Sequence, residues 1–430
     1  MSARFIAAVR HPFGGVGTGT GCPEPNVRGD RQISVNAVKV GLGMLCVVVL
    51  GLAGCGQDVP LDLADRGGWV RLPDPPLSGR NDANIVGVGD DVIVFGGTDF
   101  LCPPGADCDF GDSVAFGDGA AFDRSLNEWR PIAGLPVPTI LADTAVVGDE
   151  VFALTRSLGG VHRELVAYDV SDDAWARIDL PDDTAPLGRN SIVATDDAIV
   201  LYRTTDENGT APDWLFDPTE QSWSELPDDP LGAGFGRSMV WNGDALFLFD
   251  KALVESPGGA DGPSYTRTAR YQDGTWTALA TADTIGPAPA LVDRHRLIAP
   301  VLGCADGGEN NNYGRCIPFG AAFDTIANEW GDLPNAPGKG RKDISSYGGV
   351  SGTDLVAGST SGPFFDATTD EWFDLPPLDP ETDQSSSDIE NQTFVTRRAA
   401  PVGDAIVVVG GDKFGPDGSA LLADAYMWTP

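Results

Sequence analysis

A short module recurs along this chain with fixed spacing: an aromatic residue, an aspartate, five turn residues and then a tryptophan. Five copies place the tryptophan six residues after the aspartate. They are Phe122-Asp123 to Trp129, Tyr168-Asp169 to Trp175, Phe216-Asp217 to Trp223, Phe323-Asp324 to Trp330 and Phe365-Asp366 to Trp372. A shortened copy runs from Tyr271 to Trp276. Repeats at intervals of about 40 to 50 residues predict an array of similar supersecondary units.

Each unit begins with a tight-turn signal between two apolar stretches, as in Val88-Gly89-Asp90-Asp91-Val92 and Val402-Gly403-Asp404-Ala405. Gly and Asp beside β-branched residues favour a hairpin, because the turn needs positive φ and the strands need stiff side chains. Two strands joined by this turn, a variable loop, a third strand carrying the aromatic-Asp pair and a fourth carrying the tryptophan make one propeller blade. We call these strands a, b, c and d.

Counting the modules predicts seven blades. The expected strand-d tryptophans are Trp69, Trp129, Trp175, Trp223, Trp276, Trp330 and Trp372. The expected strand-c aromatics are Phe122, Tyr168, Phe216, Tyr271, Phe323, Phe365 and Tyr426. The first tryptophan has no strand c before it, and Tyr426 has no module tryptophan after it. The fold predicted is therefore all-β, a seven-bladed β-propeller whose N-terminal strand completes the last blade.

The pattern resembles kelch repeats, with Gly96-Gly97 and Gly410-Gly411 as the double glycine after strand b. The resemblance spans residues 67–430, although the middle blades lack the double glycine and blade five lacks the Gly-Asp turn. It implies a propeller of kelch type, distantly similar to the central domain of galactose oxidase. The module residues are expected to pack between blades and to form the c–d turn.

The N-terminal region reads as an export signal. Basic residues precede the apolar run from Val40 to Leu52, which is too short to span a bilayer comfortably. Leu52-Ala53-Gly54-Cys55 resembles a bacterial lipobox, which implies lipidation of Cys55 and an extracytoplasmic protein anchored to the membrane only through that lipid. An ordinary signal peptide or a buried apolar strand is the alternative. The predicted organisation is an upstream segment and signal peptide at 1–54, a lipidated cysteine and tether at 55–66 and the propeller at 67–430.

The net charge limits the kinds of partner, and the predicted export determines how the cysteines are expected to pair. The formal net charge of −35 disfavours nucleic acid and anionic lipid headgroups as partners. Export favours disulfides, so we expect Cys102 to pair with Cys108 and Cys304 with Cys316. A two-cysteine metal site is the alternative for each pair.

Strand direction places the b–c and d–a connections on one face of a propeller, and here they carry nearly all the variation in loop length. Variable loops on a rigid scaffold are the usual place for binding residues. A basic residue also opens strand a in several blades: Arg80, Arg189, Arg237, Arg341, Arg397 and Arg398. These arginines either bind a carboxylate or sulfate at the channel mouth or form ion pairs with aspartates of neighbouring blades.

The sequence patterns for a metal site and for catalysis are weaker than those for the fold and the loop face. Asp107, Asp109 and Asp112, with Asp118 nearby, could hold calcium in the blade-one loop, although the terminal Glu of a calcium loop is missing. No other cofactor is expected. The galactose oxidase resemblance would imply a copper site of two histidines and two tyrosines, but His162 and His295 are expected on opposite faces.

The function predicted is a non-catalytic extracytoplasmic binding or scaffold module, expected to be a monomer, that engages a glycan or a protein through the b–c and d–a loop face. The alternative is a carbohydrate-active enzyme, sialidase-like or sugar epimerase-like, at the channel mouth. Fold resemblance alone does not choose between these functions.

Overall fold

The computed structural model describes residues 68–429 with gaps, and all regular structure in this part of the chain is β. The gaps are 104–105, 160–161, 182–183, 185–188, 207, 254–262, 287–290, 293–294, 302, 308–311, 337–347, 351–354, 358–362, 375–377 and 379–392. Only the backbone is described at 162–163, 291, 305–307, 312–316, 348–350, 355–357, 363 and 374. Across the described residues there is no helix with the length and apolar character needed to cross a bilayer. The predicted signal peptide, Cys55 and the tether lie outside the described residues.

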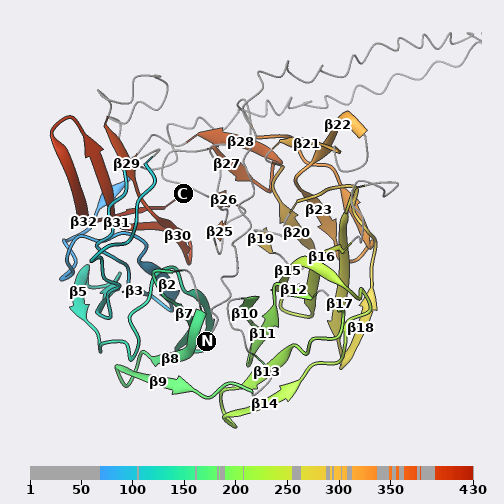
Figure 1. Ribbon diagram of the computed structural model, residues 1–430, viewed down its shortest axis with the longest axis horizontal. Coiled ribbons are helices and arrows are strands. Elements are labelled where there is room, and N and C mark those ends of the chain that lie inside the picture. The colour runs from blue at the N-terminus through green and yellow to red at the C-terminus, as the bar shows by residue number, and fades with distance from the viewer. Residues whose placement is uncertain are drawn as a thin grey trace, which may run out of the picture. The chain divides into compact units, whose positions relative to one another are not determined.

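Seven antiparallel sheets of four or five strands follow one another along the described chain, and we number them in that order (Figure 1). Sheet 1 is β2 (Asn84–Val88), β3 (Asp91–Phe95), β4 (Gly119–Asp123) and β5 (Glu128–Pro131). Sheet 2 is β6 (Asp143–Val147), β7 (Glu150–Arg156), β8 (His162–Asp169) and β9 (Ala174–Ile178). Sheet 3 is β10 (Asn190–Ala194), β11 (Ile199–Arg203), β13 (Trp214–Asp217) and β14 (Ser222–Glu225).

The later sheets carry additions to the same plan. Sheet 4 is β15 (Gly234–Trp241), β16 (Leu246–Ala252), β17 (Thr266–Gln272) and β18 (Thr275–Ala278), and β12 (Thr205–Asp206) pairs with β15. Sheet 5 is β19 (Leu291–Val292), β20 (Arg296–Ala299), β23 (Ala321–Asp324) and β24 (Glu329–Gly331), with a separate hairpin of β21 (Cys304–Gly307) and β22 (Asn312–Pro318) in its b–c connection. Sheet 6 is β25 (Gly348–Val350), β26 (Leu355–Ala357), β27 (Pro363–Asp366) and β28 (Glu371–Asp374).

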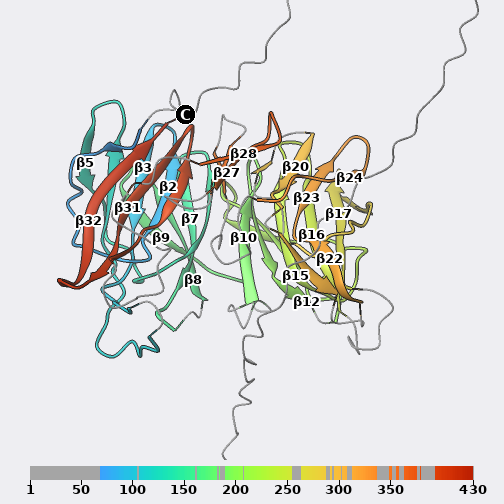
Figure 2. The same ribbon diagram turned by 90° about the horizontal axis from the view of Figure 1, so that it is seen from above.

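Sheet 7 joins the two ends of the described chain. It contains β29 (Phe394–Thr396), β30 (Ala399–Val402), the long strands β31 (Ala405–Gly415) and β32 (Gly418–Trp428), and β1 (Val70–Arg71). β31 and β32 form an extended hairpin (Figure 2). β1 pairs antiparallel with β32, so the first described strand lies in the same sheet as the last one.

Strand b of sheet 1 is apolar after its first residue because both of its faces are covered. In β3, Val92 and Val94 pack in a cluster shared with sheet 7, whereas Ile93 and Phe95 pack in a cluster shared with sheet 2. Successive strand residues point to opposite faces, so one five-residue strand serves two interfaces.

Seven such hydrophobic clusters occur among the described residues, and each one joins two sheets. The pairs are sheets 1 and 2, 2 and 3, 3 and 4, 4 and 5, 5 and 6, 6 and 7, and 7 and 1. The core is therefore distributed between the sheets, and this agrees with the predicted propeller class.

The module aspartate organises the turn between strands c and d. Asp169 shows the contacts: its Oδ1 accepts hydrogen bonds from the backbone N–H groups of Ser171 and Asp172, at 2.8 and 2.9 Å. Asp123, Asp217 and Asp324 make the same pair of bonds. The residue two positions before the tryptophan then takes positive φ, as at Asn127, Asp173, Gln221, Asn328 and Asp370. The predicted turn role of the module aspartate is confirmed at these positions.

The module tryptophan links one sheet to the preceding one. Its ring packs on the aromatic residue opposite it in strand c, as Trp129 does on Phe122 with centroids 5.0 Å apart. Its indole N–H donates to a backbone carbonyl four residues beyond the preceding module tryptophan. The pairs are Trp129 to Pro73, Trp175 to Ala133, Trp223 to Asp179, Trp276 to Pro227, Trp330 to Ala280 and Trp372 to Pro334. These side chains are only partly buried, so the polar N–H remains near the edge while the ring packs inward.

In sheet 7 the predicted aromatic was wrong by two residues. Ile406 in strand b pairs with Trp428, as Val92 pairs with Phe122 in sheet 1, so Trp428 and not Tyr426 stands at the module position. Trp428 is fully buried and packs in a cluster with Trp69. Two aromatic residues lie in this strand on the same side, since they are two positions apart, and only the pairing register distinguishes them.

The double glycines are required by both conformation and space. Gly410 and Gly411 have φ of 70° and 116°, and a Cβ on them would lie 2.5 Å from the Arg80 carbonyl oxygen and 2.2 Å from the Thr396 carbonyl oxygen, respectively. Any side chain there would push apart the backbones that converge at the start of strand a.

Candidate functional site

The b–c and d–a connections leave the sheets at the same end of the strands, which we call the loop face. Their lengths vary, as predicted: residues 96–118 connect β3 to β4, and the β21–β22 hairpin lies in the corresponding connection of sheet 5. The turns at the opposite end are short, as at residues 89–90 and 148–149. Binding groups held on a rigid scaffold are therefore expected at the loop face.

Three of the predicted binding arginines are engaged in ion pairs, and their side chains are at most 3% exposed. They are Arg80 with Asp118, Arg237 with Asp213 and Arg397 with Asp424, each at 2.7 Å. Ion pairing was the alternative to ligand binding for these arginines. Of the three, only Arg237 pairs with a carboxylate of the neighbouring sheet. These three guanidinium groups hold the loop face together and are not presented at its surface.

Arg237 sits at the centre of a buried network between sheets 3 and 4. Its Nη2 lies 2.9 Å from Asp229 Oδ2 as well as near Asp213, and its Nη1 donates to the Arg203 carbonyl oxygen at 2.8 Å. Burial raises the pKa of Asp213 above its usual value, against the lowering effect of the hydrogen bond and charge of Arg237. Arg237 therefore supplies the hydrogen bond and the positive charge that favour the ionised form of the Asp213 carboxyl.

The other three predicted arginines have different surroundings. Arg189 lies exposed just before β10, and Arg341 is outside the described residues. Arg398 precedes β30, its side chain is 51% exposed, and its Nε lies 3.4 Å from Asp82 Oδ1. Arg398 thus lines a cavity.

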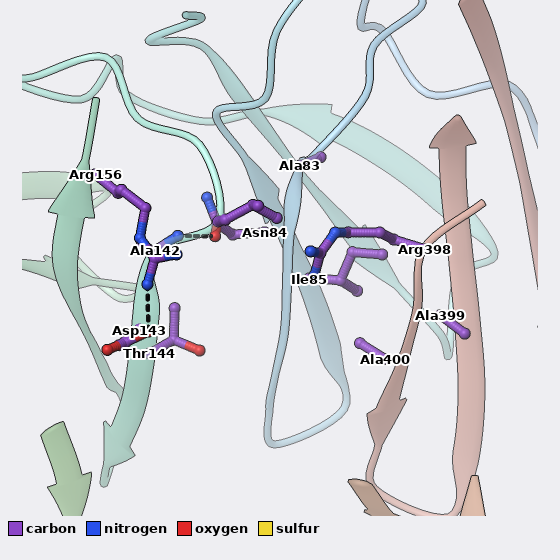
Figure 3. A pocket seen from close by; sticks show the side chains of 11 residues that line it. Ala83, Asn84, Ile85, Ala142, Asp143, Thr144, Arg156, Arg398, Ala399 and Ala400 are labelled. Atoms are coloured by element: carbon purple, nitrogen blue, oxygen red, sulfur yellow. Dashed lines mark hydrogen bonds and ion pairs between the residues drawn. The ribbon is translucent and has the colours of Figure 1, made fainter. Parts of the chain in front are cut away.

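This cavity lies at the loop-face ends of the first strands of sheets 7, 1 and 2 and has a volume of about 320 Å³ (Figure 3). Alanines provide much of its wall: Ala83, Ala142, Ala399 and Ala400. Arg398 stands at one side of the cavity and Arg156 at the other, with Asn84 between them (Figure 3). Arg156 Nη2 lies 3.3 Å from Asp143 Oδ1. The sequence reasoning missed Arg156 and Asp143, because nothing in their local sequence distinguishes them from other strand-end polar residues.

Asn84 fixes the geometry of this cavity. Its side-chain oxygen accepts a hydrogen bond from the Ala142 N–H at 2.7 Å, and its side-chain nitrogen donates to the Phe95 carbonyl oxygen at 3.2 Å. The amide is buried and engaged at both ends. It therefore ties the start of β2 to the start of β6 and holds two walls of the cavity in place.

Two residues at the rim of the same cavity have positive φ. Asp82 and Leu141 have φ of 55° and 43°, and the Leu141 N–H donates to the Asp82 carbonyl oxygen at 3.1 Å. Positive φ is tolerated by aspartate but is a genuine outlier for leucine. Such residues cluster at ligand sites, where the surrounding structure holds them in place.

The long loop of sheet 1, residues 98–118, is the second feature of the loop face. A disulfide joins Cys102 to Cys108, as predicted, and the rings of Phe100 and Phe110 pack 4.8 Å apart. Its base is held by Arg80, whose guanidinium lies 4.6 Å from the Phe116 ring centroid. Phe110 and Val114 remain exposed. The loop thus presents apolar side chains on a cross-linked support.

The aspartates of the predicted calcium site do not form a metal-holding group in the described part of the chain. Asp107, Asp109 and Asp112 are exposed, Asp118 is engaged by Arg80, and no group of three or more His, Cys, Asp or Glu residues among the described residues is arranged to hold a metal ion. The predicted calcium site stays a prediction. Cys304 is disulfide-bonded, but the side chain of Cys316 lies outside the described residues, so that pairing also stays a prediction.

His162 and His295 occupy different ends of their sheets. His162 begins β8 at the loop face, and only its backbone is described, whereas His295 lies in the turn before β20. His295 lines a second, smaller cavity of about 170 Å³ together with Asp244 and Arg270.

Carboxylates at the loop-face cavity bear on the predicted carbohydrate-active alternative. The described lining of this cavity includes one carboxylate, Asp143. Glycoside hydrolysis generally uses two carboxylates that flank the bond.

Comparison with known proteins agrees with the repeat pattern, although no family model matches the chain. The kelch-like protein terF of Aspergillus terreus is 24% identical over 353 residues, which cover 74% of this chain and 72% of that protein. A putative F-box/kelch-repeat protein of Arabidopsis thaliana, At1g27420, is 23% identical over 218 residues, or 49% of this chain and 58% of that protein. These similarities and the all-β architecture suggest a protein of the kelch-repeat class, and with it a protein-interaction or scaffold module.

Proposed function

We propose that this protein is a seven-bladed kelch propeller that works as a non-catalytic binding module and engages a protein partner through its loop face. Closure of the ring is supported by the seven interfaces between sheets, which include one between sheets 7 and 1. It is also supported by the pairing of β1 with β32, because the first and the last described strands then share one sheet, which resists opening of the ring.

The observation that carries the binding proposal is the loop at residues 98–118. Phe110 and Val114 are large apolar side chains exposed on a loop that a disulfide cross-links and an arginine clamps. A pre-ordered loop loses less conformational freedom on binding, so more of the contact energy appears as affinity. Kelch relatives favour a protein partner, and the described lining of the loop-face cavity contains no aromatic ring on which a sugar could stack.

Site-specific photocrosslinking in intact cells of the source organism tests which face binds. A photoreactive phenylalanine analogue is placed singly at Phe110 or Val114, on the loop face, or at Leu126 or Ile326, which are exposed in c–d turns at the opposite end. We expect a discrete cross-linked protein band from the first two positions and none from the second two. The matched positions control for expression and for non-specific contacts.

Equal cross-linking from both ends, or a partner captured only from Leu126 and Ile326, would contradict the assignment of the loop face. A second arm keeps the loop-face analogue at Val114 and replaces Phe110 by aspartate. The cross-linked band should weaken at least about tenfold if the apolar contact supports binding, since 1.4 kcal/mol corresponds to a tenfold change.

We further propose that the protein is exported and held at the bacterial membrane by lipid on Cys55, as the lipobox resemblance implies. The Cys55→Ser variant should move from the membrane fraction to the soluble fraction, while its melting temperature stays unchanged after removal of the signal. Fractionation and the mass of the mature N-terminus measure this. A wild-type N-terminus that lacks the mass of a diacylglyceryl group would disprove the anchor.

A further inference from the structure

We propose that the cavity bounded by Arg398, Arg156 and the four alanines binds a small carboxylate, independently of the protein partner. The volume of about 320 Å³ lies at the lower end of the range of small-molecule sites. Four alanines at the ends of three neighbouring strands leave this space, and Asn84 ties two of the walls together. The cavity is therefore part of the fold and does not depend on a single side chain.

The charge of the lining selects an anion. Two arginines, Arg156 and Arg398, line the cavity with one carboxylate, Asp143, and a second carboxylate, Asp82, stands at the rim beside Arg398. In a chain whose net charge is −35, a cavity whose positive and negative groups balance is a favourable place for an anion. The two carboxylates beside the arginines favour a monovalent anion over a phosphate dianion.

The shape of the donor groups selects a carboxylate. A guanidinium presents a planar fork of N–H groups that matches the two oxygens of a carboxylate. Among the described residues Arg398 makes one contact, from Nε to Asp82 at 3.4 Å, which is long for a charge-assisted bond. A carboxylate in the cavity would meet the two terminal nitrogens of the half-exposed Arg398. Arg156 Nη2 is paired with Asp143, which lines the cavity as well, and Thr144 lines the same wall.

The strained rim is a separate sign of a ligand site. Asp82, which contacts Arg398, and Leu141, which lines the cavity, are two residues with positive φ joined by a backbone hydrogen bond. Strain of this kind persists only where the surrounding structure enforces it, as it often does at binding sites. Here it places Asp82 beside Arg398 and the Leu141 backbone at the cavity wall.

Ligand-observed NMR and calorimetry on the full mature chain test the proposal with acetate, lactate and succinate as probes. Acetamide serves as the neutral analogue of acetate, and phosphate and sulfate serve as competing anions. We expect saturable binding of a carboxylate that acetamide does not show. The Arg398→Gln variant should weaken this binding at least tenfold. The control Arg71→Gln, which replaces an exposed arginine in an ion pair outside the cavity, should leave it unchanged.

A filling variant separates the cavity from general charge effects. Ala400→Leu adds a side chain to the cavity wall without changing charge, and it should abolish carboxylate binding while circular dichroism stays native. The proposal is overturned if no carboxylate binds saturably, if Arg398→Gln and Ala400→Leu bind as the wild type does, or if phosphate and sulfate bind as tightly as the carboxylates. The carboxylate assay contains no protein partner. A failure to detect a cross-linked partner would therefore contradict the proposed protein-binding function without changing the outcome of the carboxylate assay.

Discussion

The Arg237→Met variant is expected to lose about 3–5 kcal/mol of stability, the range for removing one partner of a buried ion pair. Arg237 neutralises Asp213 and Asp229 between sheets 3 and 4, and both carboxylates are buried. Methionine keeps much of the side-chain volume but leaves two buried charges without a cation. Urea unfolding followed by tryptophan fluorescence measures the loss.

The matched control is Arg124→Met, which breaks an ion pair with Asp404 whose carboxylate is exposed to solvent. It should cost no more than about 1 kcal/mol. If both variants lose the same free energy of unfolding, the buried network stabilises the protein no more than a surface ion pair does. The stabilising role given to Arg237 between sheets 3 and 4 would then be wrong.

Acidification should partly rescue Arg237→Met. Burial already raises the pKa of Asp213 above its unfolded value, and removal of the arginine takes away the interactions that lower it. A group with a raised folded pKa favours the folded state below its unfolded pKa, and this contribution is lost as pH rises through the folded pKa. The stability gap between wild type and variant should therefore be smaller at pH 5 than at pH 7.5. A constant gap would mean that the carboxylates remain solvated.

The Trp428→Ala variant is expected to cost about 3–5 kcal/mol, as for other buried large-to-small changes at aromatic residues. Trp428 is 1% exposed and packs with Phe364, Phe373 and Ile406 at the interface of sheets 6 and 7, against Trp69. The cavity left behind would loosen the sheet that contains both the first and the last described strands. Hydrogen exchange should then accelerate in β1, β28 and β32 before it does in sheet 3.

Tyr426→Phe is the companion variant, since Tyr426 was the aromatic that the repeat pattern predicted for this position. It removes one hydrogen bond, from the Tyr426 hydroxyl to Asp424 Oδ2 at 3.0 Å, and should cost only about 1 kcal/mol. A larger loss of stability for Tyr426→Phe than for Trp428→Ala would contradict the register assigned to the last strand.

The repeat elements were predictable because each one is local. The turn after Asp169 closes within three residues, and the aromatic partner of Trp175 lies seven residues before it. The spacing of such elements can be read from the sequence because their contacts join residues that are close in the chain. The last blade was the exception, because Tyr426 and Trp428 point to the same face of one strand and only the pairing with Ile406 shows which fills the module position.

The candidate site was predictable only in outline. The sequence indicated the loop face and included Arg398 among six arginines, but the roles of the six depend on which carboxylates the fold brings near them. Arg80 and Asp118 are separated by 38 residues, and their pairing depends on the length and course of the long loop.

The sequence by itself determined the all-β repeat architecture, the turn and packing module, and the loop face, since these follow from short-range spacing and strand direction. Only the tertiary structure decided which arginines are buried and which one lines a cavity. The cavity combines Asn84, Asp143 and Arg398 from three sheets, and residues so far apart in the chain leave no local pattern. Their meeting depends on the packing of sheet 1 against sheets 2 and 7, which long-range hydrophobic contacts determine.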